Sequence, residues 1–191
     1  MAAPLTKRLP RDFFDDAAPF KCDGVYCKLI PLTQGQFALI WLEDYSALSV
    51  FRWGAQWDAK MGSFYATRAL CTEDRKRKVI SMHRQILGLG FGDARHGDHA
   101  FHVTLDNRRF IGDKPNVRIA DHSENGCNQK RSNINSTGFK GVTKDRDTYR
   151  ARIGKNGKMK YLGARKTAEA AWRELYVPAA LALHGEFARF V

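Results

Sequence analysis

The sequence predicts an α+β chain. A small amino-terminal β-rich unit leads into two strands and a helix, and a three-stranded antiparallel sheet packed on one long helix follows. Three observations support this prediction. Apolar and polar residues alternate in several stretches between residues 25 and 82. Ser, Asn, Thr and Gly cluster at 130–138. Turn signals and an apolar stripe of helical period come after that cluster.

The amino-terminal unit has the alternation typical of strands. Four strands are predicted, at 25–33, 35–42, 64–70 and 76–82. The stretch MHRQILGL (82–89) suits a short helix that ends at the following glycines. Residues 1–20 lack such a pattern and are expected to form a flexible arm.

The composition points to a polyanionic partner inside the cell. The 191 residues include 32 Lys and Arg against 20 Asp and Glu, a net charge of +12. Four cysteines without a CxxC pair indicate reduced thiols. The longest uncharged run, 29–42, is too short and too polar to cross a bilayer, and no signal peptide is apparent. We therefore expect a cytoplasmic protein with no membrane partner, and a monomer is compatible with the sequence.

The basic charge is concentrated after the polar stretch. Residues 131–191 contain 13 basic and 5 acidic side chains, whereas residues 1–130 contain 19 and 15. The predicted organisation is an arm at 1–20, a first domain at 21–130 with its core at about 95–130, a linker at 131–137, and a second domain at 138–191.

Residues 95–128 combine the groups that a metal-dependent phosphodiesterase needs. Asp98 is a hard oxygen donor suited to Mg²⁺ or Mn²⁺. His99 can take a proton from water near neutral pH. Asparagines can orient a histidine or donate an oxygen to a metal, and arginines can hold phosphate. The asparagines are Asn107, Asn116 and Asn125, and the arginines are Arg108, Arg109 and Arg118.

In their order, DH (98–99), LDNRR (105–109), NVRIA (116–120) and SEN (123–125) resemble the HNH (ββα-metal) nucleases, specifically the homing-type endonucleases of phages and introns. The resemblance extends upstream through KLIPLTQG, FYATR and ISMHRQILGL. It implies a bacterial host cytoplasm if a phage encodes the chain.

The resemblance also implies a role for each motif residue. His99 would be the general base, and Asp98 and Asn125 would be the metal ligands. Asn116 would fix the histidine loop, with Asn107 as the alternative, because FIGDKP (110–115) lengthens the connection before Asn116. His122 lies three residues before Asn125 on the same face of the expected helix, so it is the alternative ligand.

The carboxy-terminal stretch reads as three strands and a helix. GFKGVT, DTYRARIG and GKMKYLG are joined by turns, of which Lys-Asn-Gly is a strong hairpin signal. Thr167 is a good N-cap, and an apolar stripe runs from residue 168 to residue 183. Pro178 should kink this helix. Arg150 and Arg152 share one face of their strand, and that face should remain free for DNA.

GFKGV, YRARI, YLG, TAEAAW and ALHGEFARF resemble the DNA-binding domain of plant ethylene-response factors, which is also found fused to HNH nucleases. Together the two resemblances cover about 25–191. The side chains expected to contact DNA in this part are Lys140, Lys144, Arg146, Arg150, Arg152, Lys158, Lys160 and Tyr161. The residues at the base-contacting positions of the plant factors differ here, so the target sequence cannot be carried over.

We therefore expect a site-directed endonuclease that acts on double-stranded DNA with one Mg²⁺ or Mn²⁺ ion. Two alternatives remain open at this point. A DNA-binding regulator with an inactive HNH remnant is favoured by the FIGDKP insertion. An RNA-binding module could use the same basic surface.

Overall fold

The structure is a computed structural model, which describes residues 17–190 except 60, 72–75 and 133. Most of the expected arm therefore lies outside the described residues. The chain divides into two compact units. The first unit comprises 17–93 and 97–119, and the second comprises 94–96 and 120–190. The division falls before the helix of the expected nuclease core, rather than at 131–137. The α+β class is confirmed.

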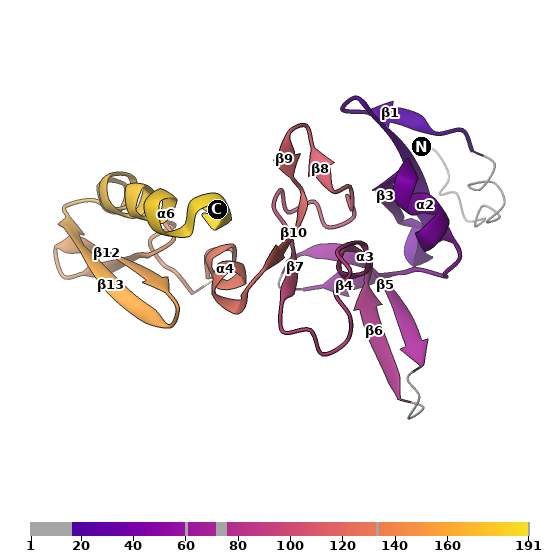
Figure 1. Cartoon of the computed structure of the whole chain (residues 1–191). Coiled ribbons are helices and arrows are strands. Elements are labelled where there is room, and N and C mark those ends of the chain that lie inside the picture. The colour runs from indigo at the N-terminus through magenta and orange to yellow at the C-terminus, as the bar shows by residue number, and fades with distance from the viewer. Residues whose placement is uncertain (1–16, 60, 72–75, 133, 191) are drawn as a thin grey trace, which may run out of the picture. The chain divides into compact units, whose positions relative to one another are not determined.

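The first unit contains two three-stranded antiparallel sheets, each followed by a helix (Figure 1). One sheet is formed by β1 (Phe20–Cys22), β2 (Val25–Pro31) and β3 (Phe37–Trp41), with helix α2 (Leu42–Ser49) after it and the short turn η1 (Thr33–Gly35) within it. The other is formed by β4 (Gly54–Asp58), β5 (Ser63–Cys71) and β6 (Arg77–Ser81), with helix α3 (Met82–Ile86) after it. The four strands and the short helix predicted from the sequence are all present.

A single apolar core joins these sheets and helices. Ile40 and Met82 are fully buried in it, and Trp53 donates its indole N–H to the Leu48 carbonyl oxygen at 2.9 Å. Trp57, by contrast, is 54% exposed. The other members of the core are Ile30, Ala38, Leu48, Ala66, Ile86 and Val117. This core fixes the two sheets that support the candidate site.

The histidine-rich segment forms two strand pairs. Strand β7 (His96–His99) pairs with β10 (Val117–Ala120), and β8 (Phe110–Ile111) pairs with β9 (Lys114–Pro115). FIGDKP therefore folds back on itself as a hairpin, turning at Gly112 with φ 57°. The Asn116 backbone N–H donates to the Arg109 carbonyl oxygen at 2.8 Å. The hairpin thus leaves the residues on either side of the insertion next to each other.

The second unit begins with helix α4 (His122–Cys127), which is started by a capping box formed by Asp121 and Glu124. The expected three-stranded antiparallel sheet follows as β11 (Val142–Asp145), β12 (Thr148–Lys155) and β13 (Lys158–Arg165). One helical stretch packs against it, made of α5 (Ala168–Ala171), η2 (Trp172–Tyr176), α6 (Val177–His184) and η3 (Gly185–Phe187) (Figure 1).

Pro178 changes the helix in a specific way. A proline has no backbone N–H to donate to the carbonyl of residue 174. Before the proline the helix contains the π-helical turn η2, in which the Val177 N–H donates a hydrogen bond to the Trp172 carbonyl oxygen. The extra residue rotates the following face, so that His184 is buried and Leu183 is 37% exposed. The expected apolar stripe is therefore wrong at its last position.

Residues 134–138 of the polar stretch belong to the second unit and bond to its backbone. The Asn135 side-chain amide donates to the Phe139 and Val142 carbonyl oxygens at 2.9 and 3.2 Å, and its oxygen accepts from the Thr137 N–H at 2.9 Å. This is the local side chain–backbone bonding that makes Asn and Thr common in turns. No helix in the described ranges is long and apolar enough to cross a bilayer.

Candidate active site and nucleic-acid interface

Asp98 and His99 end strand β7 and are both buried, with exposures of 8% and 4%. Their position against β10 brings Arg118 to Asp98. Nε and Nη2 of Arg118 each lie 3.0 Å from Oδ2 of Asp98. The expected metal ligand therefore accepts a two-nitrogen ion pair from the neighbouring strand.

The imidazole of His99 is oriented by Asn107. Nε2 of His99 lies 3.3 Å from Oδ1 of Asn107, while Nδ2 of Asn107 donates to the Leu105 carbonyl oxygen at 3.2 Å. In this orientation the asparagine oxygen can only accept, so Nε2 of His99 carries the proton. Nδ1 then holds the lone pair of the neutral ring and is the nitrogen able to take a proton.

Asn116 is completely buried and fixes the loop that carries Asn107. Its Nδ2 donates to the carbonyl oxygens of Asp106 and Arg108, both at 2.9 Å, one on each side of Asn107. Its own backbone oxygen accepts from the Ala100 N–H at 2.8 Å, just after His99. The two asparagines that the sequence left as alternatives thus make different contacts. Asn107 contacts the histidine, and Asn116 holds the backbone around it.

Two aromatic residues that the sequence analysis did not single out pack on His99. The His83 and His99 rings are 4.6 Å apart in an edge-on arrangement, and Tyr65 lies 5.8 and 5.9 Å from them. Gly97 makes this possible, because a Cβ there would lie 2.5 Å from Cδ2 of His83. In the sequence His83 lay within an ordinary helical pattern, which gave no sign of this contact.

Burial sets the charge of both histidines. Burial lowers the pKa of His99 to about 4, against smaller opposing effects of the Asn107 hydrogen bond and the Asp98 charge. Burial, and then the neighbouring His99, lowers the pKa of His83 well below its usual value. Both rings are therefore neutral at pH 7, and His99 is already in the form that a general base requires.

We expect acid to destabilise the first unit through His83. Its pKa in the folded state lies below the unfolded value of about 6.5, so below that pH the unfolded chain binds more protons. This stabilising effect is complete above about pH 6.5. It falls as the pH decreases toward the folded pKa, by up to about 1.4 kcal/mol per pH unit. Urea unfolding between pH 7.5 and 5.5 measures the free energy of unfolding of wild type and His83→Gln, and it should fall more steeply with decreasing pH in wild type. Equal pH slopes would refute this expectation.

The three arginines expected to hold phosphate are engaged by carboxylates within the first unit. Arg108 is 4% exposed and pairs with Asp106 and Asp23, each at 2.7 Å, and its hydrogen bond to Asp106 is the main reason its pKa is raised. Arg109 pairs with Asp44 at 2.7 Å. Arg118 pairs with Asp98. These arginines support the loop geometry in the structure, and their expected phosphate contacts stay a prediction.

The expected helical ligands lie in α4 of the second unit. Asn125 is half-buried, while His122 is exposed with its ring 5.7 Å from that of His96. Over the described ranges, no trio of His, Cys, Asp or Glu side chains is arranged to hold a metal. The ligand set implied by the HNH resemblance is not such a trio, because it consists of the carboxylate of Asp98 and the amide oxygen of Asn125.

The basic side chains of the second unit divide into paired and exposed groups. Arg150 pairs with Asp145 at 2.5 Å, and Lys140 donates to the carbonyl oxygens of Cys127 and Gln129. Arg152 is exposed and lies opposite Tyr161 in the β12–β13 register. The remaining exposed residues of the expected interface are Lys144, Arg146, Lys158 and Lys160.

The sheet turns its other face to the helix. Ala151 and Ile153 are buried against it, and Arg150 and Arg152 alternate with them along β12. The expected separation of an apolar face from a basic face is therefore present in this sheet.

No protein-family model matches the chain, and no curated protein or solved structure is significantly similar to it. Function is therefore inferred from the geometry of the site together with the motifs of the sequence.

Proposed function

We propose that this chain is a metal-dependent DNA endonuclease of the HNH class, directed to its target by the carboxy-terminal sheet. One observation carries the proposal. His99 is buried and neutral, is oriented by Asn107 on a loop that Asn116 fixes, and follows Asp98 directly on strand β7. These residues belong to the same motif that resembles the HNH nucleases.

His99 would act as the general base on the attacking water. With Nε2 directed to Asn107, Nδ1 accepts the proton as the water oxygen approaches phosphorus. Asn107 then stabilises the imidazolium through the same hydrogen bond. A positioned base of this kind contributes about 10²–10⁴-fold to the rate.

The donor set at this site suits Mg²⁺ or Mn²⁺. The buried carboxylate of Asp98 is the kind of oxygen ligand that these ions prefer, and the resemblance adds the amide oxygen of Asn125. When bound, the cation would stabilise the charge that develops on the scissile phosphate and on the leaving 3′ oxygen. The ion pair with Arg118 fixes the position of the Asp98 carboxylate on strand β7.

The sheet of the second unit would provide most of the DNA affinity. Arg152 and Tyr161 lie opposite each other on the face away from the helix, and Lys144, Lys158 and Lys160 are exposed elsewhere in the same sheet. Phosphate contacts from such a surface set register and orientation, and a few base contacts add specificity.

We expect Arg152→Ala to flatten the salt dependence of DNA binding. Each phosphate contact contributes about −0.9 to the slope of log K against log [salt], so the change should be about 0.9. Arg150→Ala should have a smaller effect, because its guanidinium is already paired with Asp145. Arg173→Ala, which removes the same charge from an exposed helical position, is the control. Titrations on one duplex would contradict the proposed face if Arg152→Ala matched Arg173→Ala.

A second candidate function is a DNA-binding regulator without nuclease activity. The ion pair between Arg118 and Asp98 favours it, because both contacts from Arg118 fall on one oxygen of the expected metal ligand. Nicking of supercoiled plasmid with and without Mg²⁺ separates the two functions. Metal-dependent nicking that His99→Ala removes supports the nuclease. DNA binding without nicking supports the regulator.

A further inference from the structure

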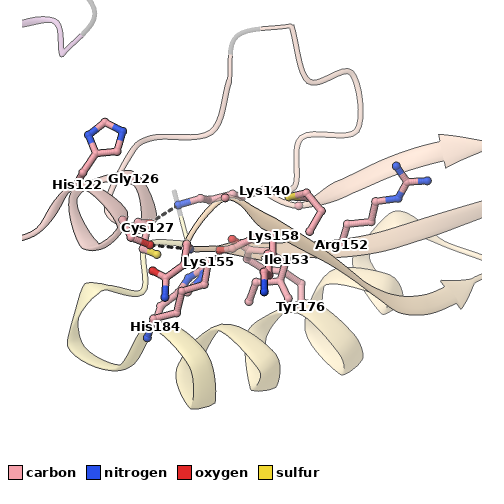
Figure 2. A pocket seen from close by; sticks show the side chains of 16 residues that line it. His122, Gly126, Cys127, Lys140, Arg152, Ile153, Lys155, Lys158, Tyr176 and His184 are labelled. Carbon is pink, nitrogen blue, oxygen red and sulfur yellow. Dashed lines mark hydrogen bonds between the residues drawn. The ribbon is translucent and has the colours of Figure 1, made fainter.

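The second unit contains a pocket of about 470 Å³ formed by residues of helix α4, the β12–β13 hairpin and the end of helix α6 (Figure 2). Its apolar lining includes Ile153, Met159 and Tyr176. Tyr176 packs closely on Gly141, where an added Cβ would lie 2.1 Å from the ring. The volume is in the range of small-molecule sites, and the apolar lining suits a planar ring.

The charged groups of the pocket are all basic. Lys140, Lys155 and Lys158 line it, and no aspartate or glutamate is among the described residues that do so. Arg152 also lines it, but Figure 2 shows its side chain extending away from the other labelled side chains. A concave surface with several cations and no carboxylate attracts anions.

Two of the lysines are held in place by the backbone. Nζ of Lys155 donates to the Leu183 carbonyl oxygen at 2.6 Å, and Nζ of Lys140 donates to those of Cys127 and Gln129 at 2.6 and 2.7 Å. An ammonium group has three N–H donors, so Lys155 keeps two and Lys140 keeps one beyond these bonds. Because the groups are already ordered, a ligand that they contact loses less affinity to side-chain ordering.

We propose that this pocket binds a phosphate-bearing ligand of nucleotide size. The phosphate oxygens would accept from the ammonium groups of Lys140, Lys155 and Lys158, and the ring would lie against Met159, whose side chain is exposed. A terminal phosphate carries about −1.5 to −2 charge and three acceptor oxygens, which matches three donor cations better than a single carboxylate does. Burial lowers the pKa of Lys140 to about 8, so an anion beside it would favour its charged form.

This ligand chemistry has two sources, a free nucleotide or the phosphorylated end of a DNA strand. The proposal does not depend on the proposed nuclease activity, since both sources are recognised by binding alone. The proposed pocket is distinct from the proposed contact between the sheet and DNA, because it would bind a terminal phosphate and its nucleoside rather than the backbone of a duplex.

Calorimetry on the full chain tests the phosphate site with three probes: deoxyadenosine 5′-monophosphate, deoxyadenosine and inorganic phosphate. We expect the nucleotide to bind at least about tenfold more tightly than the nucleoside, as expected for charge-assisted hydrogen bonds. Lys155→Gln and Lys158→Gln should each weaken nucleotide binding about tenfold. Lys166→Gln, which removes the same charge from an exposed position outside the pocket, should leave it within about twofold.

Absence of nucleotide binding at millimolar concentration would overturn the proposal, as would equal losses in the Lys158→Gln and Lys166→Gln proteins. Lys158 is exposed, so its replacement leaves the core unchanged. Competition with a short duplex then identifies the source. Displacement of the nucleotide only by a 5′-phosphorylated duplex assigns the pocket to DNA ends. Nucleotide binding that persists beside either duplex assigns it to a free nucleotide.

Discussion

Replacing His99 with alanine should reduce DNA cleavage by about 10²-fold or more while DNA affinity stays nearly unchanged. The ring is the group proposed to take the proton from water, and it is 4% exposed within the first unit. It therefore contributes little to a basic binding surface. Single-turnover cleavage and equilibrium binding on the same duplex measure the two effects separately.

The control for this experiment is His102→Asn, because asparagine tolerates the positive φ of 60° at that position. It should keep wild-type cleavage. Since His99 is buried, thermal unfolding of His99→Ala and His99→Gln shows whether each variant is folded. A folded His99→Ala protein that retains more than about a tenth of the wild-type rate would exclude His99 as the general base.

Replacing either expected metal ligand should lower metal-dependent cleavage by at least about tenfold. Even mutating a residue that only hydrogen-bonds a metal ligand lowers metal affinity or activity by about 10–100-fold. Asp98→Asn keeps the shape of the side chain beside Arg118 and removes its charge. Asn125→Ala removes the amide oxygen from helix α4. Cleavage rates over a series of Mg²⁺ and Mn²⁺ concentrations should show that both variants need more metal.

His122→Ala is the matched comparison for Asn125→Ala, because the two residues lie three positions apart in the same short helix. It should keep near wild-type metal dependence. The opposite result, an inactive His122→Ala protein and an active Asn125→Ala protein, would transfer the ligand role to His122.

The elements predicted from the sequence are those with local signals. Strands β2, β3, β5 and β6 are rich in β-branched and aromatic residues. The β12–β13 hairpin turns at Asn156 and Gly157, both with positive φ. Helix α2 was missed because LEDYSALS follows a predicted strand without a break. Strand β4, GAQWD, is too polar to show a strand pattern and is held by its pairing with β5.

The candidate site was predictable only in part. The motif placed Asp98, His99, Asn107 and Asn116 in one neighbourhood, and the contacts of His99, Asn107 and Asn116 are present in the first unit. The packing of His83 on His99 and the pairing of Arg109 with Asp44 join residues far apart in the chain. Such contacts depend on how two sheets pack together, and no local pattern in the sequence encodes them.

The FIGDKP insertion (110–115) lengthens the chain before Asn116 without separating Asn116 from Arg109 in space. Counted along the chain, six extra residues separate Asn116 from LDNRR and favour an inactive remnant. In space they close into the β8–β9 hairpin, whose base holds Asn116 against Arg109. The insertion therefore leaves the loop geometry around His99 intact, and this weakens the argument for inactivity.

The most direct test of the endonuclease proposal uses the DNA that flanks the gene for this chain. The purified protein is incubated with that duplex and Mg²⁺, with binding confirmed on the same fragment, and the ends are mapped. The proposal predicts cleavage at discrete positions, with 5′-phosphate and 3′-hydroxyl ends, that EDTA and His99→Ala both abolish. Stable binding to the fragment without metal-dependent cleavage would contradict it.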